Sequence, residues 1–455
     1  MASSSTSSVD PRIQVLPRVL GLWALILYGI VAITPSAPVT VFGIAQRDSG
    51  GHALDTILFA MVAMVLTATS YGRMAAIYPS AGSAYAYVGR GLNPHLGFLA
   101  GWAMLLDYIF IPLFCVIYGS GALLRLVPGM PMVVATGLFA TVITIANLRG
   151  IRTAARFSEV MVGAMMVVLL TFIALAIKYI VGHGGPAALI STTPFYNPAT
   201  FNLQTVGVAT AFAALTYLGF DSVTTLAEDV ENPKRNVMLA AVSVCLFTGL
   251  FGGFFTYLAV LVWPDWSTFG NFDNAFLDVA GRVGGDGLFA AMGILLVVAN
   301  IGAGMTSQTG ASRLLFGMGR DNVFPRKFFA HLSPKKTPTY NILLIGVIAF
   351  AGAQWASVEI VGHLLNFGAF LGFMGVNATV VWCFFVRKQV GRSRNFLTDL
   401  LVPLIAFSFC LYGWLNLSHE AWLAGGTWFA VGIIYLAIRT KGFREKPVQL
   451  DFSGV

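Results

Sequence analysis

Charged residues are scarce in this chain. They make up only 10% of its 455 residues, whereas 57% are hydrophobic. Soluble domains carry roughly 25% charged residues, because their surface faces water. This chain has too little charge to cover a water-facing surface of that kind. The composition therefore excludes a large soluble domain and predicts an integral membrane protein.

Patterns of enzyme and metal chemistry are also missing. The four cysteines stand singly, and no Cys-x-x-Cys or Cys/His spacing joins them, so neither disulfides nor metal sites are indicated. The chain contains no phosphate-binding loop, nucleophile elbow or metalloenzyme signature. We therefore expect no cofactor, no metal and no enzymatic activity. The cysteines are Cys115, Cys245, Cys383 and Cys410.

Long apolar stretches fill most of the sequence. Twelve of them are about long enough to cross a bilayer, and we expect them to form one membrane domain over residues 16–445. Serine-rich residues 1–15 are predicted to be a disordered tail, and 446–455 a short C-terminal tail. The predicted spans are 20–45, 54–78, 97–124, 130–148, 154–181, 202–229, 236–263, 287–316, 339–355, 359–386, 398–417 and 421–438.

The net charge of +8 is distributed unevenly between the two ends of these spans. If both termini share one side, 23 of the 27 basic residues lie on that side. The exceptions are Arg47, Arg125, Lys178 and Arg282. Basic residues gather in this way on cytoplasmic loops. The pattern predicts cytoplasmic termini and membrane lipids as neighbours, and it argues against a nucleic-acid partner.

Two of the predicted spans are interrupted. The span over 20–45 contains Pro35 and Pro38, which remove backbone donors, so the carbonyls of Val31 and Thr34 should lose their helical partners. We expect Ser36 to cap the helix that resumes there. The span over 201–230 is interrupted at 218–221, where a glycine tolerates unusual backbone angles, and its Asp or Ser at 221–222 is expected to cap the second half-helix. The alternative is that the prolines merely kink a packed helix.

The two interruptions fall in the first and sixth spans. That spacing fits two inverted repeats of five spans, over about 18–182 and 200–386, followed by two further helices at about 397–440. A broken membrane helix exposes backbone groups that lipid cannot satisfy, so it survives where it lines a cavity. Paired breaks of this kind indicate the substrate site of a secondary transporter.

Acidic residues within the spans are the sharpest candidates for a binding role. Asp107 lies near the centre of the third span with no basic residue one helical turn away, and a charge there costs on the order of 3 kcal/mol. A cationic substrate or a proton is its natural partner, and a protonated structural Asp is the alternative. Asp221 lies at the second break and could simply cap a helix. Glu228 is a candidate for proton coupling or for an inner gate, whereas its neighbours indicate interfacial ion pairs.

Aromatic residues and broken backbone surround these carboxylates. Aromatic faces attract ammonium groups, but aromatics are 13% of the chain, so most of them serve packing. We select those that adjoin an acidic residue or a break. The predicted substrate-binding residues are Asp107, Tyr108, Pro35, Ser36, Ala37, Tyr217, Gly219, Phe220 and Asp221, with Asp107, Asp221 and Glu228 as proton-coupling or gate candidates.

Several local motifs together resemble those of one transporter family. They are Tyr78-Pro79-Ser80-Ala81-Gly82-Ser83-Ala84-Tyr85, Gly97-Phe98 through Leu105-Leu106-Asp107-Tyr108, Gly219-Phe220-Asp221 with Glu228, Gly319-Arg320-Asp321 with Phe324-Pro325, Thr337-Pro338, Asn366-Phe367-Gly368-Ala369 and Val376-Asn377. On these residues the chain resembles the amino acid–polyamine–organocation transporter superfamily, and within it the bacterial putrescine importers, over about residues 15–445.

The resemblance implies an all-α fold of LeuT type with broken helices one and six, alternating access, and a site between spans one, three, six, eight and ten. It also implies a bacterial inner-membrane location. Amino-acid carriers of this superfamily usually place free amides in the first break for a substrate carboxylate. Here prolines occupy that break, and Asp107 adds negative charge. Some proton-coupled relatives carry a lysine in span five, where the alignment puts Met165.

These features favour a proton-coupled importer of a small organic amine, with putrescine as the best candidate. The first alternative is an amino-acid permease of the same superfamily, working by proton symport or by exchange. The second is a transporter-like receptor that binds an amine without moving it. The sequence does not fix the oligomeric state.

Overall fold

The computed structural model describes residues 20–79, 83–149, 154–227, 229–320, 323–334, 337–387 and 394–447, without the side chains of 154–159. Ten helical segments in this part are long and apolar enough to span a membrane, and the bent pair α1–α2 makes an eleventh span. The shorter apolar helix α13 lies where the ninth predicted span belongs. The all-α prediction is confirmed, and a count of twelve spans is compatible with these helices if α13 is the ninth.

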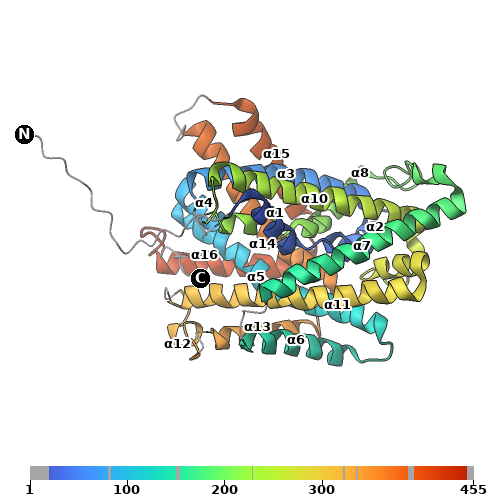
Figure 1. The fold of residues 1–455 in the computed structure, drawn as a ribbon. Helices are drawn as coiled ribbons and strands as arrows, with labels where there is room; N and C mark the ends of the chain where they lie inside the picture. Colours follow the sequence, from blue (N-terminus) through green and yellow to red (C-terminus); the bar gives the residue numbers. More distant parts are fainter. Residues whose placement is uncertain are drawn as a thin grey trace, which may run out of the picture.

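The helices lie side by side in one elongated bundle (Figure 1). The elements of the first half are α1 Leu22–Ile33, α2 Ala37–Asp48, α3 Ala53–Ile77, α4 Ser83–Gly91, α5 Pro94–Leu126, α6 Met132–Arg149, α7 Ala154–Gly184 and η2 Pro186–Leu189. Those of the second half are α8 Leu203–Ala213, η3 Ala214–Tyr217, α9 Ser222–Thr225, α10 Pro233–Val262, η4 Trp266–Thr268, α11 Ala275–Arg320, α12 Arg326–Phe329, α13 Thr339–Gly352, α14 Val358–Val380 and η5 Val381–Val386. The last are η6 Leu397–Leu401, α15 Val402–Leu415 and α16 His419–Arg439.

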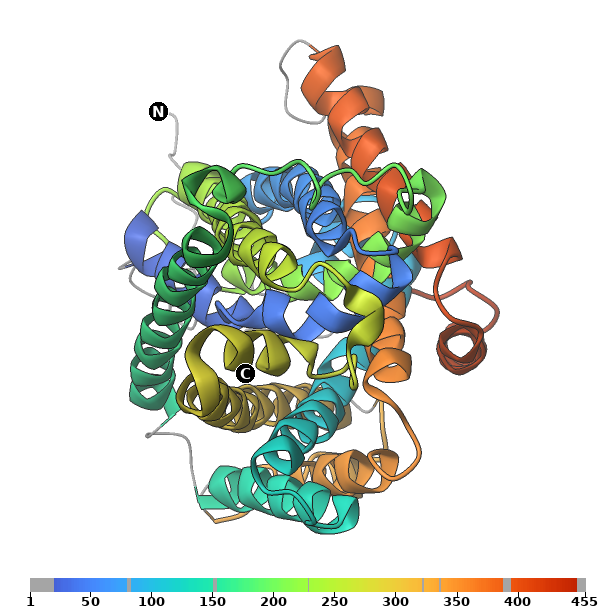
Figure 2. The same cartoon turned by 90° about the vertical axis from the view of Figure 1, so that its right-hand side faces the viewer.

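Neighbouring helices place α5 at the centre of the bundle. It packs against α4, α6, α11, α13, α14 and α16, while α10 runs along α3. Figure 2 looks along the bundle and shows α7, α15 and α16 at its edge. We call the end that carries Arg73, Arg90 and Arg149 the basic end, and the other the opposite end. In Figure 1 the basic end, with α4 and α12, is on the left.

Helix α14 crosses close to α5, the helix that carries Asp107. On α14, a methyl group added to Gly368 would lie 2.3 Å from the carbonyl oxygen of Ala103 and 3.3 Å from the Cβ of Leu106. Only a glycine allows α14 to approach the α5 backbone so closely. The helix that bears Asp107 is thus held one turn from a fixed contact inside the apolar bundle.

Candidate functional site

The first break ends α1 as the prolines predict. Thr34, which precedes Pro35, has φ 69° and ψ 131°, and its amide donates to the Ile30 carbonyl at 3.0 Å. A residue before proline is driven out of the helical region, and a β-branched residue at positive φ is a clear outlier. Strain of this kind clusters at functional sites. The axes of α1 and α2 differ by 46°.

Two local details of this break differ from expectation. The Thr34 carbonyl is not orphaned, because the Ala37 amide donates to it at 3.1 Å. Ser36 precedes α2 but makes no side-chain cap. Its hydroxyl instead contacts the Met165 sulfur at 3.8 Å, because α7 packs against the break. Met165 stands at the position where some relatives are expected to have a lysine. It contacts the first break, but as a methionine it places no positive charge there.

The second break is centred on Gly219. Leu218 leaves helical geometry with ψ 131°, and Gly219 has φ +105°, a conformation that side chains disfavour. The next helix, α9, has only four residues, so the sixth span is shorter beyond its break than predicted. The capping prediction is wrong: Asp221 makes no side-chain cap, and the Ser222 hydroxyl donates backward to the Gly219 carbonyl at 2.6 Å.

The two breaks meet inside the bundle. A methyl group added to Gly219 would lie 3.2 Å from the carbonyl oxygen of Ala32, in the last turn of α1. At the basic end the same two spans are paired by backbone hydrogen bonds. The Leu20 amide donates to the Asp229 carbonyl at 3.0 Å, and the Glu231 amide donates to the Leu20 carbonyl at 3.0 Å. Spans one and six therefore form one unit.

Asp107 lies outside this unit and Asp221 within it, and neither has a counter-ion among the described residues. The Asp107 Oδ1 atom is buried and lacks a hydrogen-bond partner, yet the residue keeps accessible surface. Asp221, 8% exposed, interacts electrostatically with Asp107. Among the described residues, no ion pair involves either carboxylate.

Two tyrosines adjoin the carboxylates. Tyr108 is close enough to both Asp107 and Asp221 for electrostatic interaction, and its ring lies 3.8 Å from the position of a methyl group added to Gly310 of α11. Tyr28 of α1 lies beside Thr225 and interacts with Asp221. Spans one, three and six thus place polar side chains around Asp221, and span eight adjoins them at Gly310.

The other predicted aromatic residues point elsewhere. Tyr217 is fully buried, and its hydroxyl donates to the Ile57 carbonyl of α3 at 2.8 Å. Phe220 is also fully buried and packs against Tyr71 and Phe373, with ring centroids 5.4 and 5.2 Å away. In this conformation both anchor the second break to its neighbours, and their contact with substrate stays a prediction. Glu228 lies outside the described residues, as do the tail 1–15 and residues 448–455.

Sequence reasoning missed a tyrosine pair behind the second break. Tyr71 of α3 and Tyr87 of α4 are both 0% exposed; the Tyr87 hydroxyl bonds to Thr224, and the Tyr71 hydroxyl has no hydrogen-bond partner among the described residues. Both interact electrostatically with Asp221. The available signal was a run of polar residues, Thr67-Ala68-Thr69-Ser70-Tyr71, within an otherwise apolar span.

At the opposite end of the bundle, aromatic rings and an ion pair connect helices of different spans. Phe42 of α2 packs edge to face against Phe269 and Phe276, with centroids 6.0 and 5.4 Å away. The Arg47 guanidinium donates to Glu359 of α14 at 2.8 Å. Aromatic packing and an ion pair therefore join spans one, eight and ten on that side.

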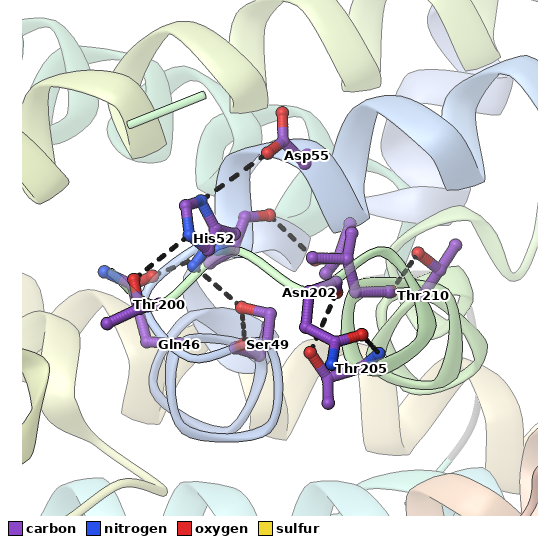
Figure 3. Close-up of polar contacts among 12 residues, drawn as sticks. Gln46, Ser49, His52, Asp55, Thr200, Asn202, Thr205 and Thr210 are labelled. Atoms are coloured by element: carbon purple, nitrogen blue, oxygen red, sulfur yellow. Dashed lines mark hydrogen bonds and ion pairs between the residues drawn. The ribbon is translucent and has the colours of Figure 1, made fainter. Parts of the chain in front are cut away.

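A polar cluster at the same end joins the α2–α3 turn to the loop before α8 (Figure 3). The His52 amide donates to the Ser49 hydroxyl at 2.9 Å, and the imidazole lies 3.3 Å from the Thr200 hydroxyl and 3.7 Å from Asp55. The Ala53 amide donates to the Gln46 side chain at 3.0 Å. Burial lowers the pKa of the His52 imidazole, so the neutral form is favoured in this setting.

Comparison with known proteins agrees with this architecture. The family model described as amino acid permease matches residues 20–438. The chain therefore belongs to the amino acid permease family, within the amino acid–polyamine–organocation superfamily. The resemblance seen in the local motifs is confirmed.

Relatives of similar length are named for different substrates. The chain is 31% identical to the low-affinity putrescine importer PlaP of Escherichia coli (strain K12), over 98% of both chains. It is 27% identical to the methylthioribose transporter of Bacillus subtilis (strain 168), over 96% of both. Its fold is similar to the crystal structure of MhsT in complex with L-phenylalanine, with a TM-score of 0.57, 16% identity, and coverage of 86% of this chain and 97% of that chain. The LeuT-type fold prediction is confirmed.

Proposed function

We propose that the protein imports a small organic amine, best represented by putrescine, by proton-coupled alternating access. One observation carries the proposal: Asp107 and Asp221 interact electrostatically inside the apolar bundle, and neither forms an ion pair with a described residue. Unpaired buried carboxylates are costly, so they call for a proton or a cationic ligand. A diamine supplies two ammonium groups for two carboxylates. The 31% identity to a putrescine importer supports the same substrate class.

The backbone of the first break also favours a cation over a carboxylate. Pro35 and Pro38 have no amide hydrogen, and the amides of Thr34 and Ala37 already donate to Ile30 and Thr34. Few amides remain for a substrate carboxylate. The last carbonyl groups of α1 have no amide partner within the helix, so their oxygens can accept hydrogen bonds from an ammonium group. Pro35, Ser36, Ala37 and Gly219 would line the site through their backbone.

Import would require the contacts at the opposite end to separate. The Phe42 cluster and the Arg47–Glu359 pair join helices of different spans there, and in this proposal they form the gate on that side. We place the basic end in the cytoplasm of a bacterial cell, because basic loops remain on that side. Opening of the opposite end would then admit substrate from outside. Asp107, Asp221 and Glu228 are the groups that could carry the coupled proton.

The second candidate is an amino-acid permease. It is supported by a relative 25% identical over 90% of this chain, the branched-chain amino acid permease BcaP of Lactococcus lactis subsp. cremoris (strain MG1363). A zwitterion would present one ammonium group to two carboxylates and leave its own carboxylate near Asp107. The site favours it less than a diamine on electrostatic grounds.

Uptake by liposomes containing the purified protein tests the proposal. Labelled putrescine should accumulate when protons flow inward, and a protonophore should abolish the accumulation. Counterflow by an amino acid, but not by putrescine, would favour the permease. Putrescine binding without counterflow would indicate a receptor. Absence of both binding and uptake would exclude the amine.

A further inference from the structure

The buried tyrosines behind the second break include an unsatisfied hydroxyl. Tyr71 and Tyr87 are each 0% exposed, and their rings meet edge to face with centroids 6.0 Å apart. The Tyr71 hydroxyl has no hydrogen-bond partner among the described residues, whereas the Tyr87 hydroxyl bonds to Thr224. Buried polar groups are nearly always satisfied in folded proteins, by protein atoms or by ordered water. The unsatisfied Tyr71 hydroxyl, packed on a tyrosine that bonds to the span bearing Asp221, points to a role.

The pair adjoins Asp221 on one side. Tyr71 packs on Phe220, the residue before Asp221, at 5.4 Å between ring centroids, and both tyrosines interact electrostatically with the carboxylate. Phe220 and Phe373 cover the Tyr71 ring, with Phe373 at 5.9 Å. The hydroxyl groups are therefore enclosed by aromatic rings rather than open to substrate.

On the other side, the pair reaches the start of α4. Tyr87 belongs to α4 and lies beside Thr224, one helical turn beyond Asp221. The Thr224 hydroxyl contacts the hydroxyl of Ser83, the first residue of α4, at 3.2 Å. The Thr224 hydroxyl also donates to the Asp221 carbonyl at 2.7 Å. Hydroxyl groups thus link Tyr87 through Thr224 to Ser83 at the basic end of the bundle, and Tyr71 joins them by packing on Tyr87.

We propose that Tyr71 and Tyr87 are positioning residues of a buried proton relay that links Asp221 to the start of α4, with water molecules between the hydroxyls. The Asp221 carboxyl gives up its proton to the first oxygen. Each hydroxyl or water accepts one proton and donates its own, so one O–H bond forms and one breaks at every link. A single proton leaves at the Ser83 end, and no hydroxyl remains charged. The relay rests on the proposed function in that it would serve amine import.

Tyr118 offers a matched control. It is also 0% exposed with an unpartnered hydroxyl, but it belongs to α5 toward the opposite end, where it stacks on Phe114 and interacts with Asp273. Phenylalanine at either position keeps the ring and removes one unsatisfied hydroxyl. Neither change should disturb packing.

The first test compares two transport modes in liposomes. Tyr71→Phe should reduce putrescine accumulation driven by a pH gradient by about tenfold or more, whereas putrescine exchange at equal pH should stay within about twofold. Tyr118→Phe should change neither mode. Gradient-driven accumulation at the wild-type rate in Tyr71→Phe would overturn the relay. An equal loss of both modes would also overturn it, because that result indicates a structural role.

The second test needs no substrate. Infrared difference spectra between acidic and neutral pH should contain a carboxylic-acid band that Asp221→Asn removes. That band should shift in Tyr71→Phe and stay unchanged in Tyr118→Phe. An unchanged band in Tyr71→Phe would exclude the relay whatever the substrate is. A shifted band in a protein that moves no putrescine would instead exclude the amine and retain the relay.

Discussion

The contact between the two breaks can be tested by replacing Gly219 with alanine. Gly219 has φ +105°, and an added methyl group would lie 3.2 Å from the Ala32 carbonyl oxygen. The backbone conformation alone should cost about 1–3 kcal/mol for a residue with a side chain. The methyl group must in addition push the end of α1 away by a few tenths of an ångström, because its neighbour is backbone. Gly219→Ala should therefore lower both the melting temperature and the affinity for putrescine.

Two other glycines separate these effects. Gly129 also has positive φ, +92°, but an added methyl group meets nothing within 4 Å. Gly129→Ala should therefore reduce stability through the backbone alone and leave binding unchanged. Gly426 lies in α16 with open space around it, and alanine there should be neutral or stabilise by up to about 1 kcal/mol.

The assay is thermal unfolding of each purified variant, together with equilibrium binding of labelled putrescine. Binding should fall by about tenfold or more only in Gly219→Ala, which corresponds to about 1.4 kcal/mol of lost binding free energy. If Gly219→Ala matches Gly129→Ala in both measurements, the breaks do not shape the site.

Two further predictions concern stability outside the site. Arg73 of α3 pairs with Asp399 of η6, whose side chain is 1% exposed. Asp399→Asn should lower the free energy of unfolding by up to about 3 kcal/mol, because it removes the carboxylate of a largely buried ion pair while Arg73 keeps its contacts with Thr398 and Phe384, and Arg73→Met with Asp399→Leu should recover most of the loss in thermal unfolding. At the opposite end, burial holds the pKa of His52 below its ordinary value of 6.5, with Asp55 at 3.7 Å. At His52 itself the unfolded chain binds more protons as the pH falls through 6.5, so this residue should make the wild type lose melting temperature relative to His52→Gln over that range. Identical pH profiles of the wild type and His52→Gln would contradict this assignment.

The sequence predicted the breaks because their causes are local. Pro35 cannot donate to a helix, and it forces Thr34 out of the helical region wherever the chain goes. Gly219 marks the second break for a similar reason, since few other residues adopt its backbone angles. Asp107 stood out because a carboxyl group within an apolar span has few explanations. These inferences required no knowledge of the neighbouring helices.

The side-chain contacts within the site could not be predicted, because they depend on how the helices pack against one another. The pattern around Tyr217 is the same whether its hydroxyl faces substrate or the Ile57 carbonyl, and only the position of α3 decides between them. Ser36 was expected to cap α2, but Met165 of α7 lies beside its hydroxyl. Tyr71 acquires its significance from α4 and α9, which are short elements with weak sequence signals. Directions of side chains between helices cannot be read from spacing alone.

Equilibrium binding of labelled putrescine to Asp107→Asn tests the central claim most directly. Loss of a charge-assisted hydrogen bond to an ammonium group is worth about 1.5–3 kcal/mol, so the affinity should fall by about one to two orders of magnitude. Asp286→Asn, an exposed change before the main part of α11, should bind as the wild type does. Equal affinities of Asp107→Asn and the wild-type protein would contradict the account.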